Sequence, residues 1–301
     1  MTGVKFILSI PGVLLAVSLF AQQDHIDIAN VYWRTSPANT IDSIPNDKFN
    51  FDLYTADLKI PIRMKEGKHT LIIGSEFQYS NFTSENLGLS VTSVQLQLGY
   101  QFKKKGFKTL VMFLPKISGA DFSEMNSTYI QYGGLVLNTK DRSDSFSWRY
   151  GAYYNSEFFG PMLVPLFGFD WKINKSQRLK VLAPVDVEYS VNPGAKNKAR
   201  FGFRFIGING SYRIQNNLYL DRADNNIWLF GEWYITENFV LHGKAGHSVL
   251  RKYRIYENDR RMGLKLGPIN ILDGRGTSSP LFNEGWSFEL RMLVRMPVPE
   301  D

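Results

Sequence analysis

The sequence predicts an all-β protein, a transmembrane up-and-down antiparallel β-barrel of 12 to 14 strands. Three observations favour this fold class: a segment with one apolar and one polar face, the lack of a long apolar run after the first residues, and an alternation of short and longer connections. Strands of a membrane barrel turn alternate side chains toward lipid and toward the lumen, with short periplasmic turns and longer external loops.

The clearest two-faced segment is Thr92 to Phe102. Successive side chains of a strand point to opposite sides, so alternate residues share a face. One face carries only apolar side chains, those of Val94, Leu96, Leu98, Tyr100 and Phe102. The other face carries Ser93, Gln95, Gln97, Gly99 and Gln101. In a soluble sandwich the apolar face would meet a second sheet, whereas in a membrane barrel it meets lipid.

The first residues have the pattern of a secretory signal peptide. Lys5 is followed by an apolar run, Phe6 to Phe20, and by Ala21 before two glutamines. The alternative, an N-terminal membrane anchor, is less favoured because the run is shorter than the ~20 residues that a spanning helix needs. The expectation is therefore a signal peptide over residues 1–21 and a single barrel domain over residues 22–301.

Composition agrees with a barrel in the outer membrane of a Gram-negative bacterium. The chain has no cysteine, and 14% of its residues are aromatic, enough for the interfacial girdles of a barrel. The net charge of +7 is scattered, which favours contact with anionic lipid and lipopolysaccharide over nucleic acid. The expected protein is a monomer with no cofactor and no metal ion.

Strands and connections follow one another regularly over the first two thirds of the chain. The other strands expected there are Asp27–Arg34, Tyr54–Met64, Leu71–Ser80, Phe107–Pro115, Thr128–Leu137, Ser147–Asn155, Leu163–Ile173 and Val181–Val191. Polar connections such as Asn81–Ser90 and Lys116–Ser127 alternate with short turns such as Glu66–Lys68 and Asn174–Gln177. A soluble Greek-key sandwich has no reason to keep this rhythm.

The last third is harder to assign. Arg200–Phe205 has the pattern of a strand descending to the periplasm, and Ile227–Ile235 with Phe239–His247 predicts a hairpin. An ascending strand is then needed between them, and Asn217–Asp221 is the only candidate. With this strand the count is 14. Without it and without Arg200–Phe205 the count is 12, and we favour 14. His247–Asn283 is expected to be the largest external excursion, before a last strand at Trp286–Met296.

Charged residues are expected on the lumen side, because a charge facing hydrocarbon costs several kcal/mol near the midplane. The residues on this face are Asp57, Lys59, Arg63, Glu76, Arg149, Asp170, Lys172, Asp186, Glu188, Arg200, Arg204, Glu289 and Arg291. Two interpretations remain open: a hydrated path for small polar solutes, without strong ion selectivity, or charges that pair and plug a closed barrel that is structural or binds another envelope protein.

Two segments resemble a known family. Leu166-Phe167-Gly168-Phe169-Asp170-Trp171-Lys172-Ile173-Asn174 and Leu182-Ala183-Pro184-Val185-Asp186-Val187-Glu188-Tyr189 are similar to an uncharacterised family of Gram-negative outer-membrane β-barrels, domain-of-unknown-function proteins common in Bacteroidota. The resemblance implies a location and an architecture for the whole mature chain, and no activity.

A lipid-modifying enzyme is the third functional hypothesis. Some outer-membrane barrels are lipases or deacylases that use serine and histidine. His242 and His247 lie in one expected strand, with Ser248 next to His247. A nucleophile needs a base within hydrogen-bond reach and a third group that orients the base, and the spacing here specifies neither. The expectation is that the protein is not an enzyme.

Overall fold

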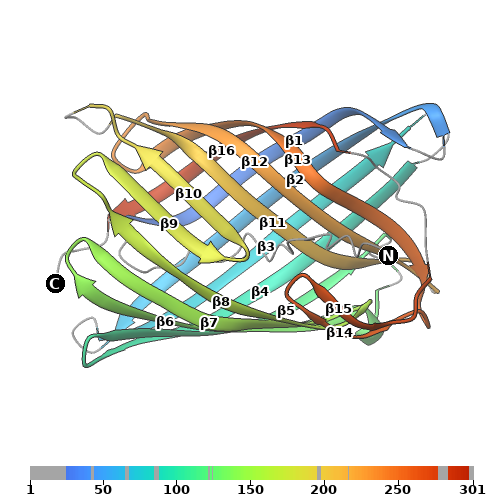
Figure 1. Cartoon of the computed structure of the whole chain (residues 1–301), viewed down its shortest axis with the longest axis horizontal. Helices are drawn as coiled ribbons and strands as arrows, with labels where there is room; N and C mark the ends of the chain where they lie inside the picture. The colour runs from blue at the N-terminus through green and yellow to red at the C-terminus, as the bar shows by residue number, and fades with distance from the viewer. Residues whose placement is uncertain are drawn as a thin grey trace, which may run out of the picture.

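The computed structural model is a closed antiparallel β-barrel with strands inclined to its long axis (Figure 1). It describes residues 25–41, 44–64, 68–84, 88–120, 123, 125–194, 198–215, 217–276 and 284–297. The expected signal peptide lies outside these residues. Within the described ranges, fourteen strands form the wall, a further hairpin of two strands joins its edge, and η1 (Ser127–Tyr129) is a single 3-10 turn.

The wall strands follow one another around the barrel in chain order. They are β1 (His25–Ile41), β2 (Ile44–Met64), β3 (His69–Thr83), β4 (Gly88–Lys104), β5 (Phe107–Gly119), β6 (Ile130–Ser143), β7 (Phe146–Glu157), β8 (Gly160–Lys172), β9 (Gln177–Ala183), β10 (Asp186–Val191), β11 (Ala199–Gln215), β12 (Leu218–Tyr234), β13 (Phe239–Glu257) and β16 (Trp286–Pro297). Pairing of β16 with both β13 and β1 closes the ring. The strand number predicted from the alternation is confirmed at fourteen.

The two ends of the barrel differ. We call the end where β1 begins and β16 finishes the terminus end; it lies at the left of Figure 1. We call the other end the hairpin end, because β14 (Met262–Leu266) and β15 (Ile269–Asp273) lie between β13 and β16 there. β14 runs parallel to the first half of β8, pairing at Met162 and Leu163.

The predicted external connections are shorter than expected. β1 and β2 run on beyond the predicted strands, so the segment around Pro37 and Asn39 is strand instead of loop. At the same end, only Phe158 and Phe159 separate β7 from β8. The rhythm of long and short connections is therefore weaker than the sequence suggested, because strands beyond the hydrocarbon do not need apolar residues to continue.

The strand predicted over residues 181–191 is wrong, because two strands occupy this stretch. β9 and β10 form a hairpin that turns at Pro184 and Val185, and the amide of Val185 donates to the carbonyl of Leu182 (2.9 Å). Proline has no amide hydrogen for a ladder bond, which suits it to a turn. The turn preserves the alternation of apolar residues, so the pattern alone does not reveal it.

The predicted strand Asn217–Asp221 is not separate either. It belongs to β12, which continues without a break to Tyr234 and includes the predicted strand Ile227–Ile235. One predicted strand is in fact two, and two predicted strands are in fact one, so the total of fourteen is unchanged. The predicted direction of Arg200–Phe205 is wrong, however, because β11, which contains it, runs away from the terminus end.

A belt of exposed apolar side chains surrounds the barrel. Leu58, Ile73, Leu96, Phe113 and Phe167 are each 43–59% exposed in the isolated chain, and they lie on different strands. Residues beside them in sequence, such as Asp57, Gln95 and Gln97, are buried inside. Apolar side chains that surround a closed ring of hydrogen-bonded strands are the surface of a transmembrane barrel.

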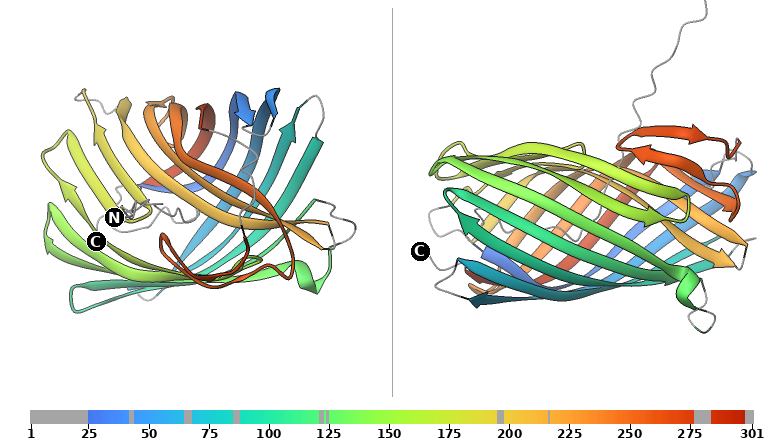
Figure 2. Two further views of the ribbon diagram at one scale, coloured as in Figure 1. Left: turned by 45° about the vertical axis from the view of Figure 1, so that its right-hand side comes forward. Right: turned by 90° about the horizontal axis from the view of Figure 1, so that it is seen from below.

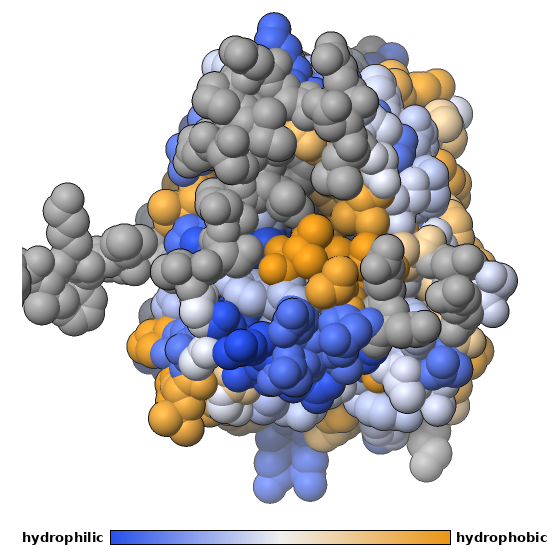
Figure 3. All heavy atoms as spheres, turned by 90° about the vertical axis from the view of Figure 1, so that its right-hand side faces the viewer, coloured by the Kyte–Doolittle hydropathy of each residue, from blue (hydrophilic) through white to orange (hydrophobic). Residues whose placement is uncertain are grey.

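The hairpin half of the barrel has an apolar cluster in its interior, beside buried Arg222, Asp224 and Arg251. Phe49, Phe51, Phe82, Tyr212 and Tyr253 pack together inside it with neighbouring buried residues. The expectation that only polar residues face inward therefore fails in this half. Figure 3, which views the hairpin end, shows apolar side chains near the middle of the surface beside a hydrophilic band.

The ends of β11 and β12 are buried on both faces. Every described residue from Ile206 to Arg213 is buried, and Arg213 pairs with Gly119 of β5, a strand that is not its neighbour in the wall. The end of β11 therefore leans across the barrel toward β5, inside the wall formed by β6 to β8. The short β9 and β10 make this possible, because they leave the second half of β11 without a wall partner on that side. Figure 2 shows the barrel from two further directions.

Candidate functional site

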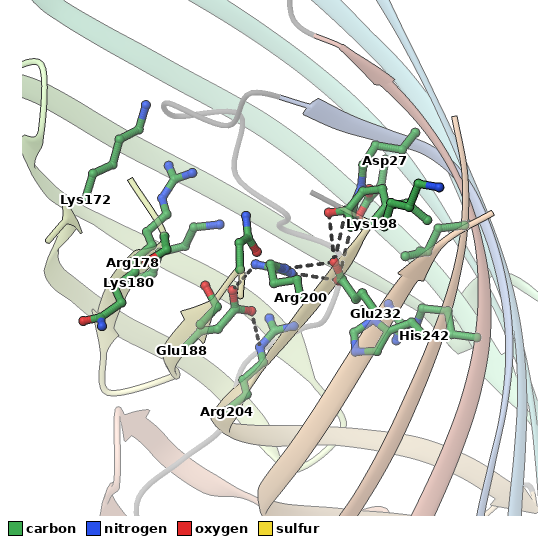
Figure 4. Close-up of a pocket in the computed structure, with 18 of the residues that line it drawn as sticks. Asp27, Lys172, Arg178, Lys180, Glu188, Lys198, Arg200, Arg204, Glu232 and His242 are labelled. Carbon is green, nitrogen blue, oxygen red and sulfur yellow. Dashed lines mark hydrogen bonds and ion pairs between the residues drawn. The ribbon is translucent and has the colours of Figure 1, made fainter. Parts of the chain in front are cut away.

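A chamber of about 890 Å³ lies at the terminus end of the barrel. Side chains of β1, β7 to β13 and β16 line it, together with the β8–β9, β10–β11 and β12–β13 connections. Its size falls in the range of pockets that hold small molecules, 300–1,000 Å³. Figure 4 shows charged side chains from several strands pointing toward one another around it.

Arginine–carboxylate pairs form one wall of the chamber. Arg200 lies between two carboxylates, with its Nη1 2.9 Å from Glu188 Oε1 and its Nη2 2.7 Å from Glu232 Oε1 (Figure 4). Arg204 binds both oxygens of Asp186, at 2.8 and 2.9 Å. Such two-point pairs are geometrically specific and roughly twice as strong as neutral hydrogen bonds. They hold β10, β11 and β12 in register on the lumen side.

A second group of charges closes the lumen beyond the chamber. Glu289 lies 2.6 Å from Arg34 Nη2, 2.8 Å from Lys244 Nζ and 2.9 Å from Arg291 Nη2. The guanidinium carbon of Arg34 lies 5.1 Å from the ring centre of Trp228, which is fully buried. These side chains occupy the middle of the barrel, where residues lining an open pore would be exposed.

The neighbouring strands complete this layer. Asp57 accepts hydrogen bonds from Asn30 Nδ2 (2.8 Å) and Gln97 Nε2 (3.0 Å), and it pairs with Lys59 at 2.6 Å. A second cavity, lined in part by Glu76 and Gln95, has a volume of about 40 Å³. The side chains of this layer, among them Asp57, Gln97 and Glu289, are buried and fill the lumen between the chamber and the hairpin half.

Glu157 holds the end of β11 in place. Its Oε2 accepts hydrogen bonds from the amide and the hydroxyl of Ser211, both at 2.7 Å, and from Gln131 Nε2 at 2.6 Å. The hydroxyl of Ser211 also lies 2.7 Å from the amide nitrogen of Phe158. One buried carboxylate thus ties β11 to β6 and β7. Because these bonds are charge-assisted and buried, they fix the inward position of the β11 end.

The thirteen charged residues predicted to face the lumen are placed as follows. Asp57, Lys59, Glu76, Arg149, Asp170, Glu188 and Glu289 are buried. Lys172, Asp186, Arg200, Arg204 and Arg291 are half-buried at the chamber, and Arg63 is exposed near the end of β2. The structure brings Arg149, Lys172, Asp186, Glu188, Arg200, Arg204 and Arg291 together in the chamber lining.

Other functional residues escaped the sequence analysis. Arg178 and Lys180 line the chamber from β9, and Glu232, Arg295 and Asp27 form its opposite wall. Arg295 Nε lies 2.6 Å from Asp27 Oδ1, a contact between the first and last strands. A signal was present, since Glu232 and Arg295 alternate with apolar residues on clear strands. Arg178 precedes the expected strand, so alternation could not place it.

The residues considered for catalysis do not assemble. The hydroxyl of Ser248 donates to the carbonyl of Gly285 (3.1 Å), while the ring of His247 lies edge-on to Trp286. His242 faces the chamber, with Nδ1 3.4 Å from Glu232. In the part of the chain that the structure describes, three or more potential metal ligands do not cluster anywhere. Among the described residues, no helix is long and apolar enough to cross a membrane.

The fold and the interior define the class of protein: a transmembrane β-barrel with a charged chamber at one end and a filled lumen at the other. Residues 17–262 match the family described as a domain of unknown function, DUF6268. The chain belongs to this family, which confirms the resemblance to an uncharacterised barrel family.

Solved structures with a similar chain course are outer-membrane barrels. The COG4313 outer membrane channel from Pseudomonas putida F1 has 10% sequence identity and a TM-score of 0.48, with 92% of this chain and 97% of that chain covered. The TodX monoaromatic hydrocarbon channel deltaS2 mutant has 10% identity and a TM-score of 0.43, with 92% and 90% covered. The translocator domain of autotransporter NalP from Neisseria meningitidis has 9% identity and a TM-score of 0.40, with 93% and 91% covered. No curated protein matches the sequence.

Proposed function

We propose that this protein is an outer-membrane channel for small polar solutes, with the terminus end in the periplasm. The observation that carries the proposal is the chamber of about 890 Å³, whose lining is dominated by charged side chains and which lies inside a ring with an apolar outer belt. A barrel that served only as a scaffold has no need for an unfilled volume of this size, because apolar packing and buried ion pairs fill the hairpin half of the same barrel.

The conformation described here is a closed state of that channel. The Glu289 layer separates the chamber from the hairpin half, and the ends of β11 and β12 fill the other side. Opening therefore requires movement of these ends away from β6 and β7, and of the side chains between them and the chamber. Glu157 and its hydrogen bonds to Ser211 are the contacts that such a movement breaks first.

Conductance in planar lipid bilayers tests the proposal. We expect the wild-type barrel to be closed most of the time and Glu157→Ala to open more often, because the variant loses the buried acceptor that holds β11. A stronger variant replaces residues 210–222, the joined ends of β11 and β12, with a two-residue Asn-Gly turn. Asp144→Asn, in an exposed turn at the terminus end, removes one carboxylate charge without touching β11 and is the control.

Folding is checked by the mobility shift of heated and unheated barrels on gels, so a silent variant can be separated from an unfolded one. If the shortened variant is folded, yet passes no current and admits no sugar or amino acid into vesicles, the channel proposal fails. The closed barrel that is structural or binds another envelope protein would then be the better description.

A further inference from the structure

The chamber lining carries an excess of positive charge. Its lysines and arginines outnumber its aspartates and glutamates ten to five. The sequence suggested no strong selectivity, because both signs occur on the lumen face. The two signs are unevenly distributed along the lumen, because several of the carboxylates lie farther from the terminus end than the chamber, in the layer around Asp57 and Glu289.

Four of the five carboxylates in the chamber lining are already bound. Glu188 and Glu232 share Arg200, and Arg204 holds Asp186. On the opposite wall, Arg295 holds Asp27 and also reaches Glu232. Three guanidinium groups thus bind four carboxylates. Of the other cations of the lining, Arg178 binds the buried Asp170 through two hydrogen bonds of 2.7 and 2.9 Å. The lining carboxylate that remains for the rest is Glu237.

In the described part of the chain, Arg149 has buried donors without acceptors, although the carboxylate of Asp170, which Arg178 binds at 2.7 and 2.9 Å, lies two residues from its β8 partner Gly168. Arg149 is 5% exposed and lines the chamber from β7, and its Nε and Nη2 have no hydrogen-bond acceptor among the described residues. A buried guanidinium without acceptors is destabilising unless another group supplies them. The side chain therefore has donors to offer to a ligand that enters from the chamber.

Lys180 lies on the same side, close to Arg149 in the sheet. Arg149 is level with Gly168 of β8 and Leu182 of β9, and Lys180 is two residues from Leu182 on the same face. Its partner across the β9–β10 ladder is Glu188, whose two oxygens already face Arg200 at 2.9 Å and Arg204 at 3.8 Å. Across the β8–β9 ladder its partner is Asp170, whose two oxygens accept from Arg178 at 2.7 and 2.9 Å. Lys180 thus lies between two carboxylates that guanidinium groups already bind.

We propose that Arg149 and Lys180 form a binding site for a phosphate or carboxylate group of a small anionic solute. The proposal deepens the proposed function, since it assigns the solute class to the same chamber. Arginine supplies a planar pair of donors that matches such groups, and lysine adds a compact positive charge. A neutral sugar of the same size lacks the charge that would compensate Arg149.

Equilibrium binding of radiolabelled inorganic phosphate to the purified barrel in detergent tests the site without any need for conduction. We expect saturable binding in the wild type and about tenfold weaker binding when Arg149→Gln or Lys180→Gln removes one charge-assisted contact. Arg149→Lys keeps the charge and retains part of the affinity. Lys104→Gln, exposed at the terminus end and outside the chamber lining, is the control and should bind as the wild type.

A water-soluble short-chain phosphatidic acid, used as a competitor, distinguishes a free anion from a lipid headgroup. If the phosphatidic acid displaces the radiolabel at a lower concentration than unlabelled inorganic phosphate does, the ligand is a lipid headgroup. If unlabelled phosphate displaces it at the lower concentration, the ligand is a free solute. Either result supports the site. Unchanged phosphate binding in a folded Arg149→Gln, Lys180→Gln double variant overturns the assignment, as does absence of saturable binding of both probes to the wild type. Binding without conductance would leave the anion site in place and refute only the channel.

Discussion

Glu289 is the residue on which the closed lumen most depends. Three cations, Arg34, Lys244 and Arg291, contact its carboxylate, which is fully buried. Removing one member of a buried ion pair leaves uncompensated charge and costs about 3–5 kcal/mol. Glu289→Gln should therefore destabilise the barrel by about that amount in unfolding by urea in lipid vesicles.

Glu237→Gln is the matched control for Glu289, because Glu237 is exposed in the β12–β13 turn. It should change stability by less than about 0.5 kcal/mol. Equal stability of the two variants would mean that the three cations find other partners, and that the layer closing the lumen is held by packing alone.

The sequence locates the inward charges and leaves their partners unknown. Alternation assigns Glu289 and Arg291 to one face because neighbours such as Leu290 are apolar. It cannot show that Arg34 approaches Glu289, since 255 positions separate them and the contact exists only when the barrel closes. Arg149 illustrates the same limit: its face is predictable, whereas its lack of acceptors is a property of the finished chamber.

At the scale of the elements, sequence patterns predicted the central strands better than the turns. β4 and β16 agree with their predictions, because membrane strands need strict alternation. The ends of β11 and β12 have protein on both sides, so alternation has no physical reason to persist there. This explains why the run from Asp221 to Asn226, mostly buried polar residues, looked like a connection.

The β14–β15 hairpin has a charged clasp of its own. Arg275 donates to Asp273 Oδ1 through Nε (2.8 Å) and to Asp221 Oδ2 through Nη1 (2.8 Å), and its guanidinium carbon lies 4.4 Å from the ring centre of Tyr256. The hydrogen bond from Arg275 lowers the pKa of Asp273 below its usual value. A single arginine therefore joins the hairpin to β12 and β13.

The clasp should weaken in acid. A carboxyl group whose pKa is lower in the folded state contributes stability above its unfolded pKa, near 4, and loses it as pH falls through the folded pKa. Amide hydrogen exchange in β15, corrected for its intrinsic pH dependence, should therefore accelerate below about pH 4 in the wild type. Asp273→Asn should show the faster exchange already at neutral pH. Identical profiles for the two proteins would contradict a role for this carboxylate.

For the whole molecule, the apolar belt defines how the barrel sits in a membrane. Leu96 is 49% exposed at the middle of β4, so its side chain should meet acyl chains. Leu96→Arg should destabilise the barrel by about 2–4 kcal/mol, the cost of arginine on the lipid face near the midplane. The measurement is again urea unfolding in vesicles.

Leu272→Arg provides the contrast. Leu272 is more exposed than Leu96, at 83%, but it lies on β15, outside the fourteen wall strands. Substitution there should have little effect on unfolding. Comparable losses at both positions would place the hairpin in hydrocarbon and require a different depth for the barrel.

The chamber opens at the terminus end and is bounded on its inner side by the Glu289 layer. In this conformation the chamber is closed at its inner end, so a bound molecule enters and leaves through the same opening. Its exchange is therefore with one compartment, and the occupancy follows the concentration in that compartment whatever the gradient across the bilayer. A membrane-impermeant reagent supplied from the opposite side should not reach Lys180 until the ends of β11 and β12 have moved.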